Sequence, residues 1–166
     1  VMQVSHGESP KDTGIILSRY GHAIAIRHDL IPGEGHRYMR EVARWADVPV
    51  INMQCDYDHP CQTLADLMTI REKLGKNLRG RKLGVAWTWG SSPKKPIAPH
   101  HDFMYAASLY GADIVFARPP EMRIDPDIEA AIKANVEASG GSYTVSDKME
   151  DACENADSTL WVDCVA

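Results

Sequence analysis

The sequence has 166 residues, of which 44% are hydrophobic and 25% charged, and its net charge at pH 7 is -5. These values are typical of one globular domain or of parts of two, and they argue against a nucleic-acid-binding protein, because no block of basic residues stands out. The longest apolar runs are far shorter than the roughly 20 residues of a membrane-spanning helix, so we expect no membrane partner.

Helices and strands alternate along the whole predicted chain. The expected elements of the first half are a helix over 10–19, a strand over 23–26, a helix over 36–46, a strand over 48–53 and a helix over 60–74. Those of the second half are a strand over 83–89, a helix over 100–110, a strand over 113–117, a helix over 126–139, a strand over 143–145 and a helix over 147–155. This alternation predicts an α/β fold with parallel sheets flanked by helices.

Two features refine the expected fold. Ser9 and Pro10 are typical of a helix start, because serine caps the first free N–H groups and proline suits the first turn. The side chains expected to be buried are Ile15, Ile16 and Leu17 in the first helix. In the helix over 60–74 they are Leu64, Leu67 and Met68, with either Ile70 or Arg71. The natural boundary lies near that last helix, so we divide the chain into 1–74 and 75–166, each an incomplete α/β part.

The cysteines favour a reduced, cytoplasmic protein without a metal centre. They are Cys55, Cys61, Cys153 and Cys164. Because no two are spaced as Cys-x-x-Cys, a structural zinc site is not expected. His100 and His101 are adjacent, and adjacent helical residues point about 100° apart, so we assign them to a loop or a helix start.

The strongest candidate site is the segment 58–62, DHPCQ. Pro60 places His59 near the start of a helix, where free N–H groups and the positive end of the helix dipole favour an anion. An imidazole N–H can donate to a carbonyl oxygen on which charge develops. The amide of Gln62 can both donate and accept, which suits an amide-like group. The alternative is that Asp58 simply caps the helix and His59 lies on the surface, and spacing alone favours it.

A second candidate is Arg27, at the carboxyl end of the first predicted strand. An arginine there can bind a phosphate or carboxylate through two N–H groups, at the edge where open α/β sheets bind ligands. The alternative is a salt bridge with Asp29 or Glu34, and spacing alone leaves both open.

A third candidate lies before the first helix. It consists of His6, Gly7, Glu8 and Ser9. A glycine loop that leads into a helix N-terminus can bind an anion. The simpler alternative, a helix cap without a ligand, is favoured by the residues alone.

The segment 58–66, DHPCQTLAD, resembles the His-Pro-x-Gln…Leu-Ala-Asp motif of aspartate and ornithine carbamoyltransferases. Neighbouring segments match the family in the same order. Residues 6–13 resemble the mobile loop and helix before that motif, and residues 25–27 resemble the strand with its arginine. Residues 48–52 resemble the strand before the motif, and residues 78–83 resemble the start of the second domain. The resemblance implies parts of two Rossmann-like domains. Residues 1–74 would be the C-terminal part of the carbamoyl phosphate-binding domain, and 75–166 the N-terminal part of the amino-acid-binding domain.

The resemblance also implies roles for the candidate residues. His59 would donate to the carbamoyl oxygen, Gln62 would bind the carbamoyl group, and Arg27 would bind the phosphate and polarise the carbonyl. The family transfers the carbamoyl group of carbamoyl phosphate to the amine of an ornithine-like amino acid, without a metal or organic cofactor. The segment 6–9 would reach toward the site of a neighbouring subunit in a homotrimer.

The chain departs from the family pattern in several places. Gly7 stands where ornithine enzymes typically have lysine, and the proline-rich loop over 87–99 resembles the knotted carbamoyltransferase branch. A Ser-x-Arg-Thr-Arg-like phosphate loop and a His-Cys-Leu-Pro-like segment do not occur, and the tail from Ser158 does not match the strand of the family. We therefore expect an internal fragment that lacks turnover by itself.

Two alternatives to a carbamoyltransferase were considered. One is a non-catalytic α/β module that keeps an anion pocket at Arg27 and His59. The other is a nucleotide-binding α/β protein, against which the absence of GxGxxG and GxxxxGK[ST] motifs counts.

Overall fold

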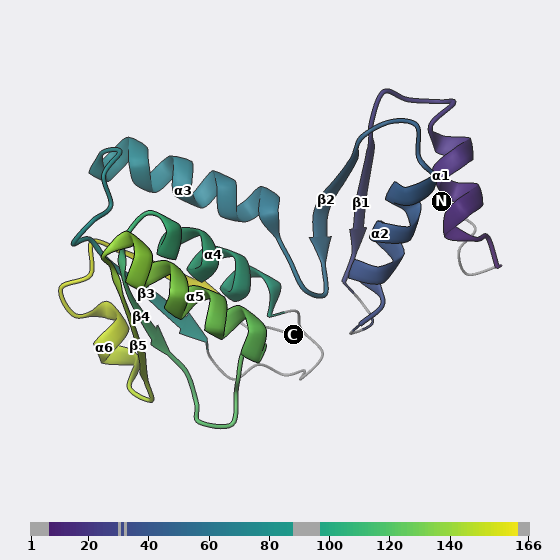
Figure 1. Cartoon of the computed structure of the whole chain (residues 1–166). Helices are drawn as coiled ribbons and strands as arrows, with labels where there is room; N and C mark the ends of the chain where they lie inside the picture. Colours follow the sequence, from purple (N-terminus) through teal and green to yellow (C-terminus); the bar gives the residue numbers. More distant parts are fainter. Residues whose placement is uncertain (1–6, 30, 32, 88–96, 163–166) are drawn as a thin grey trace.

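The computed structural model describes residues 7–29, 31, 33–87 and 97–162. The elements within these ranges are α1 (Pro10–Leu17), β1 (Ile24–His28), α2 (Gly35–Trp45), β2 (Val50–Cys55), α3 (Pro60–Leu74), β3 (Lys82–Trp87), α4 (Ala98–Leu109), β4 (Asp113–Ala117), α5 (Pro126–Ser139), β5 (Ser142–Ser146), α6 (Met149–Cys153) and β6 (Ser158–Val162). All strand pairs are parallel, and Figure 1 shows helices beside both sheets, which confirms the predicted fold class.

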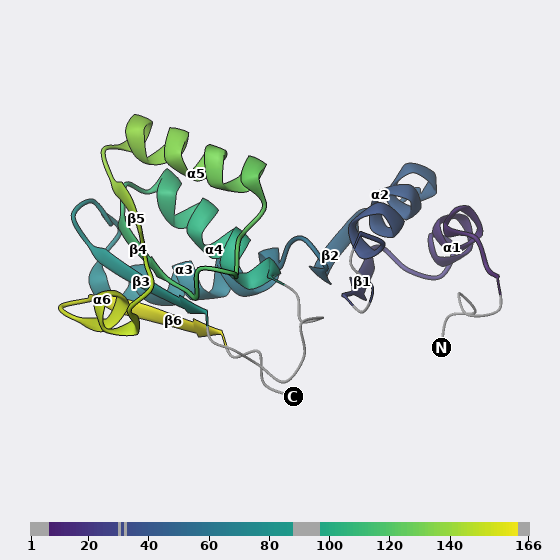
Figure 2. The same ribbon diagram turned by 90° about the horizontal axis from the view of Figure 1, so that it is seen from below.

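The first sheet contains β1 and β2. Helix α2 packs on it and α1 packs on α2, as Figures 1 and 2 show. The register shifts after Ile26, so that Ile26 pairs with Asn52 whereas Arg27 pairs with Gln54. Met53 is therefore the extra residue of a bulge. Such a bulge bends β2 at the point where it pairs with Arg27.

The second sheet has the strand order β5-β4-β3-β6. Helices α4 and α5 cover one face and α6 the other (Figure 2). Gly84 allows α6 to approach β3, because a Cβ atom at this position would overlap the carbonyl oxygen of Ala152. The close packing of α6 therefore depends on a residue without a side chain.

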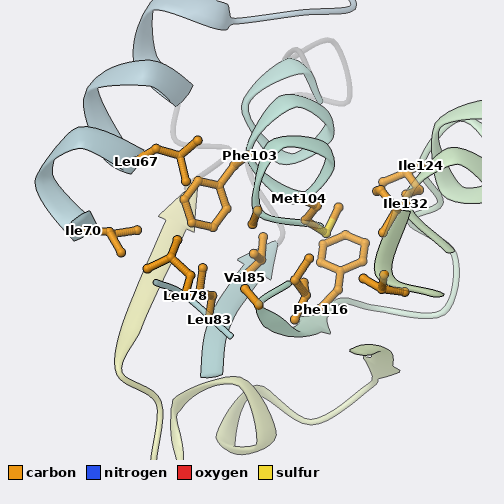
Figure 3. Packing of buried hydrophobic residues seen from close by; sticks show 14 of the residues in the cluster. Leu67, Ile70, Leu78, Leu83, Val85, Phe103, Met104, Phe116, Ile124 and Ile132 are labelled. Atoms are coloured by element: carbon orange, nitrogen blue, oxygen red, sulfur yellow. The ribbon is translucent and has the colours of Figure 1, made fainter. Parts of the chain in front are cut away.

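Helix α3 links the two sheets. It follows β2, yet Leu67 and Ile70 belong to the hydrophobic cluster of the second sheet, where Phe103, Met104 and Phe116 are also buried (Figure 3). The N-terminus of α3, which carries His59, consequently lies where the two parts of the chain meet. The boundary between residues 74 and 75 stays a prediction.

The bounds of α3 and β4 are those that the sequence predicts, but the expected buried face of α3 is partly wrong. Thr63, Leu67 and Ile70 are buried. Leu64 and Met68 are each 62% exposed. The helix therefore turns the row that contains Leu67 and Ile70, and not the neighbouring row, toward the core of the second sheet.

The expected buried face of α1 is also wrong. Ile15 is 37% and Ile16 48% exposed, whereas Thr13 and Gly14 are buried. A Cβ atom on Gly14 would lie 2.7 Å from the carbonyl oxygen of Val42. The backbones of α1 and α2 thus meet at the smallest residue of α1, and the larger isoleucines are left at the rim of the contact.

The tail forms a strand, contrary to the expectation for the segment after Ser158. Strand β6 pairs with the free edge of β3, from Leu83↔Ser158 to Trp87↔Val162. Asp157 anchors its start by accepting hydrogen bonds from the backbone N–H of Lys82 at 2.9 Å and the guanidinium of Arg81 at 2.8 Å. An edge strand of this kind needs no long apolar run, because it is covered on one side only.

Across the described ranges, every helix is too short or too polar to cross a membrane.

Candidate active site

His59 occupies the N-cap position of α3. Its side chain makes no capping hydrogen bond. Instead, its backbone N–H donates to the carboxylate of Asp102 at 2.7 Å, and its carbonyl oxygen accepts from the N–H of Thr63 at 3.2 Å. The main chain is therefore held at both ends, which leaves the imidazole available for a ligand.

The imidazole of His59 is neutral near pH 7. Burial, and then the nearby Arg27 guanidinium, lower the pKa of His59 below its ordinary value. Its Nδ1 atom is buried without a hydrogen-bond partner. A neutral imidazole has one N–H donor and one acceptor, so it can donate to a carbonyl oxygen without carrying a charge itself.

Arg27 pairs with Asp29, which confirms one of the alternatives for this residue. The guanidinium Nη2 lies 2.9 Å from Oδ2 of Asp29, whose side chain is only 14% exposed. The Arg27 side chain itself is 57% exposed. Because a guanidinium has five N–H donors, this pairing still leaves donors for an anion. The charge of Arg27 is one of the causes that lower the pKa of His59, after burial.

Gln62 and Asp66 interact along the first turns of α3. Burial raises the pKa of Asp66, and a hydrogen bond from Gln62 opposes that rise in part. Oδ2 of Asp66 and Oγ1 of Thr63 are buried without a partner, as is Nδ1 of His59. Buried polar atoms in proteins are nearly always paired, so unpaired atoms at one helix start point to a polar ligand there.

Asp102 is a candidate site residue that the sequence did not reveal. It lies in α4 and, besides His59, it hydrogen-bonds the side chain of Asp58. Burial, and then the charge of Asp58, raise the pKa of Asp102 to about 7. The one signal in the sequence is that Asp102 is the single acidic residue of this helix.

A second contact joins the same two elements. The backbone N–H of Asp125 donates to Nε2 of His101 at 3.1 Å, so Nδ1 of His101 carries the ring proton. This Nδ1–H points to the carbonyl oxygen of Tyr57, 3.3 Å away. Burial is the main cause that lowers the pKa of His101, which keeps the ring in this neutral form. His101 therefore fixes the loop that leads to His59.

The structure does not bring the segment before α1 to this site. Ser9 accepts the N–H of Asp12 at 3.1 Å, as a simple cap does, and Glu8 accepts the hydroxyl of Thr13 at 2.9 Å. Gly7 has a φ of +90°, and His6 lies outside the described residues. Figure 1 places α1 beyond α2, on the side away from α3. The role expected for this segment at a neighbouring subunit stays a prediction.

The remaining predictions concern the proline-rich loop, the cysteines and the metal-binding side chains. Residues 88–96 of the proline-rich loop that resembles the knotted branch lie outside the described residues, as does Cys164. Within the described ranges, one group combines side chains able to hold a metal ion, namely His36, Cys55 and Asp58. Its member Asp58 directly precedes His59.

Comparisons with known proteins show similarity to carbamoyltransferases. Residues 1–72 match the family model described as the carbamoyl-P binding domain of aspartate/ornithine carbamoyltransferase. The YgeW protein of Escherichia coli (strain K12) is 36% identical over 93% of this chain and 42% of its own length. An ornithine carbamoyltransferase of Rhizorhabdus wittichii is 38% identical over 94% of this chain and 45% of its own.

Solved structures give the same result. A crystal structure of N-acetyl-L-ornithine transcarbamylase superposes with a TM-score of 0.82 at 28% identity, over 92% of this chain and 48% of that one. Ornithine carbamoyltransferase from Pyrococcus furiosus superposes with a TM-score of 0.79 at 36% identity, over 96% and 47%. The chain thus spans less than half the length of these relatives. In sequence and fold the chain is thus similar to members of the aspartate/ornithine carbamoyltransferase family, and its residues 1–72 match the carbamoyl-P binding domain of that family.

Proposed function

We propose that Arg27, His59 and Gln62 form part of a carbamoyl phosphate site in a carbamoyltransferase. The acceptor is the amine of an ornithine-like amino acid. The observation that carries this proposal is the half-buried, neutral imidazole of His59 at a helix N-terminus, with a buried and unpaired Nδ1 atom and a pKa lowered by the charge of Arg27.

In the proposed reaction, Arg27 binds the phosphate and the N-terminus of α3 favours the same negative charge. The amine nitrogen attacks the carbamoyl carbon, and the carbonyl oxygen becomes negatively charged in a tetrahedral intermediate. His59 donates its N–H to that oxygen, while Gln62 orients the carbamoyl amide. The intermediate then expels phosphate and the amine loses a proton. The residues act by orientation and by stabilising charge.

The family model and the named relatives support this reading, because they concern carbamoyl phosphate and ornithine. One structural neighbour, an N-acetyl-L-ornithine transcarbamylase variant, was crystallised with carbamyl phosphate and N-succinyl-L-norvaline. The proposal includes a homotrimer, a cytoplasmic location in amino acid metabolism, and a supporting role for His6, Gly7, Glu8 and Ser9 at a neighbouring subunit.

Calorimetric titration of carbamoyl phosphate into the chain tests the proposal. Binding should be lost in a variant with both Arg27→Ala and His59→Ala. Arg44→Ala is a matched control, because Arg44 is an exposed arginine that pairs only with Glu41 among the ion pairs of the described residues. Unchanged binding by the double variant would contradict the proposal.

A non-catalytic anion-binding module is the second candidate. It is favoured by the exposed Arg27 guanidinium and the N-terminus of α3, which can hold an anion without any reaction. Such a module would bind inorganic phosphate as tightly as carbamoyl phosphate, because it would contact only the phosphate group of either ligand. Under the main proposal, carbamoyl phosphate binds more tightly, and the difference disappears in His59→Ala.

A further inference from the structure

The imidazole of His36, the thiol of Cys55 and the carboxylate of Asp58 meet at the carboxyl end of β2. Their ligand atoms all lie within 4.8 Å of one another. Nδ1 of His36 is 3.6 Å from Oδ2 of Asp58. His36 belongs to the first turn of α2, whereas the other two residues belong to β2 and to the turn that follows it. Two separate elements therefore direct metal-binding atoms to one place.

The sulfur atom of Cys55 is surrounded by N–H donors. It accepts hydrogen bonds from the backbone N–H of Asp58 at 3.1 Å and of Tyr57 at 3.4 Å, and from the side-chain amide of Asn52 at 3.4 Å. A neutral thiol is a weak acceptor, so three donors directed at one sulfur suit a thiolate. Burial of Cys55 opposes that charge and raises the pKa of the thiol. A cation bound to the sulfur would compensate for the burial.

Two members of the cluster, His36 and Asp58, are partly exposed, whereas Cys55 is buried. A surface pocket of about 180 Å³ is lined by His36, Asn52 and Asp58, among other residues. Oδ1 of Asn52 is buried without a hydrogen-bond partner. The pocket thus offers an entry path and room for a water molecule as a further ligand, next to an unpaired oxygen that can accept from that water.

We propose that His36, Cys55 and Asp58 bind a divalent transition-metal ion of the zinc class. In a tetrahedral zinc site the ligand atoms are separated by roughly 3.3 to 3.6 Å, given bond lengths of about 2.0 to 2.3 Å. The separation of 3.6 Å between His36 and Asp58 already fits. The longest separation in the cluster must shorten by roughly 1 Å, which a side-chain rotation can supply. Nitrogen, sulfur and oxygen donors together favour zinc or cobalt over magnesium or calcium.

One neighbouring charge opposes the ion. The guanidinium of Arg40 lies 3.5 Å from Nε2 of His36. Arg40 is exposed and can turn away when Nδ1 binds the metal and Nε2 carries the proton. Removing this positive charge in Arg40→Ala should therefore strengthen metal binding, whereas the loss of a ligand should weaken it.

The test is a titration of the reduced chain with Co²⁺, followed by the thiolate-to-cobalt charge-transfer absorption. We expect one ion per chain, displaced by Zn²⁺ and not by Mg²⁺. The absorption should be lost in Cys55→Ser, affinity should fall at least tenfold in His36→Gln, and it should rise in Arg40→Ala. The matched control is Cys61→Ser, because Cys61 is an exposed free cysteine on the neighbouring helix turn and should be dispensable.

Circular dichroism checks the fold of each variant. Because Cys55 is buried and its replacement can unfold the chain, His36→Gln at a partly exposed position carries the same test independently. A folded wild-type chain without the absorption, an absorption that survives Cys55→Ser, or full affinity in His36→Gln would each overturn the proposal. These readouts need no carbamoyl phosphate, so their result is separate from that of the proposed function.

Discussion

The backbone N–H of His59 donates a hydrogen bond of 2.7 Å to the carboxylate of Asp102, which lies 43 residues later in α4. This contact joins the start of α3 to the second sheet. A second bond, from His101 to the carbonyl oxygen of Tyr57, holds the same loop. The position of the His59 imidazole is therefore set by residues of the other part of the chain, which a sequence motif around His59 does not contain.

Replacing Asp102 should affect stability in a way that depends on the replacement. Asparagine keeps an oxygen that accepts from His59 and gains an N–H that can donate to Asp58. Alanine leaves the His59 N–H without its acceptor, which costs about 1 to 3 kcal/mol for a buried group. Urea unfolding should thus show Asp102→Ala to be less stable than Asp102→Asn by about that amount. Equal stability of the two variants would mean that the hydrogen bond contributes nothing.

His100 should make the chain sensitive to acid. Its ring is buried against Trp87 and Phe116, and this burial lowers its pKa to about 4. The unfolded chain, with an ordinary histidine pKa of about 6.5, therefore binds more protons between these values. The contribution of His100 to stability is fully present above about pH 6.5 and is lost as the pH falls toward about 4.

The variant His100→Phe removes this titration. Between pH 7 and pH 4.5, the wild-type chain should lose on the order of 2 kcal/mol more unfolding free energy than the variant does. Denaturant unfolding at both pH values measures the difference. The same loss in both proteins would show that His100 is not the group responsible.

Gly14→Ala should destabilise the packing of α1 on α2. Alanine favours a helix by about 1 kcal/mol over glycine. Its Cβ atom would, however, lie 2.7 Å from the carbonyl oxygen of Val42 and 3.2 Å from the amide nitrogen of Ala46, and both are backbone atoms. The strain, about 1 to 3 kcal/mol, should outweigh the gain, so the melting temperature falls. A variant as stable as the wild type would indicate that α1 can shift freely.

Turnover by this chain alone should be undetectable. The resemblance assigns further phosphate and amino-acid contacts to Ser-x-Arg-Thr-Arg-like and His-Cys-Leu-Pro-like motifs, and neither occurs in the sequence. A colorimetric assay for the carbamoylated product, with ornithine and N-acetylornithine as acceptors, measures this directly. The ornithine carbamoyltransferase of Pyrococcus furiosus provides a positive control for the ornithine assay. Product above the background without protein would contradict the expectation.

Local signals explain which parts of the fold could be predicted. Pro60 and Gly75 bracket α3 as strong start and stop signals, and its predicted bounds agree with the structure. The buried faces were harder to predict, because Leu64 and Leu67 are equally apolar and only the position of the second sheet decides between them. The close contact at Gly14 could not be predicted either. It depends on how the backbones of α1 and α2 approach each other, which the sequence of α1 alone does not determine.

The candidate site shows a similar division. His59, Gln62 and Arg27 are candidates because each lies at a helix start or a strand end, and the resemblance to the carbamoyltransferase motif, rather than spacing, assigns their roles. Asp102 was missed because its role depends on a contact between distant segments. The bulge beside Arg27 was missed for the same reason, since it is a property of the pairing of β1 with β2.

The central claim is that His59 and Arg27 bind different ends of carbamoyl phosphate. It is tested most directly by nuclear magnetic resonance of ¹³C-labelled carbamoyl phosphate with the chain, in which the carbonyl carbon and the phosphorus are observed separately. Both signals should shift on binding. With ligand sufficient to keep each variant saturated, His59→Ala should abolish mainly the carbon shift, and Arg27→Ala mainly the phosphorus shift. Signals that do not move with the folded wild-type chain, or shifts that neither variant alters, would contradict the account.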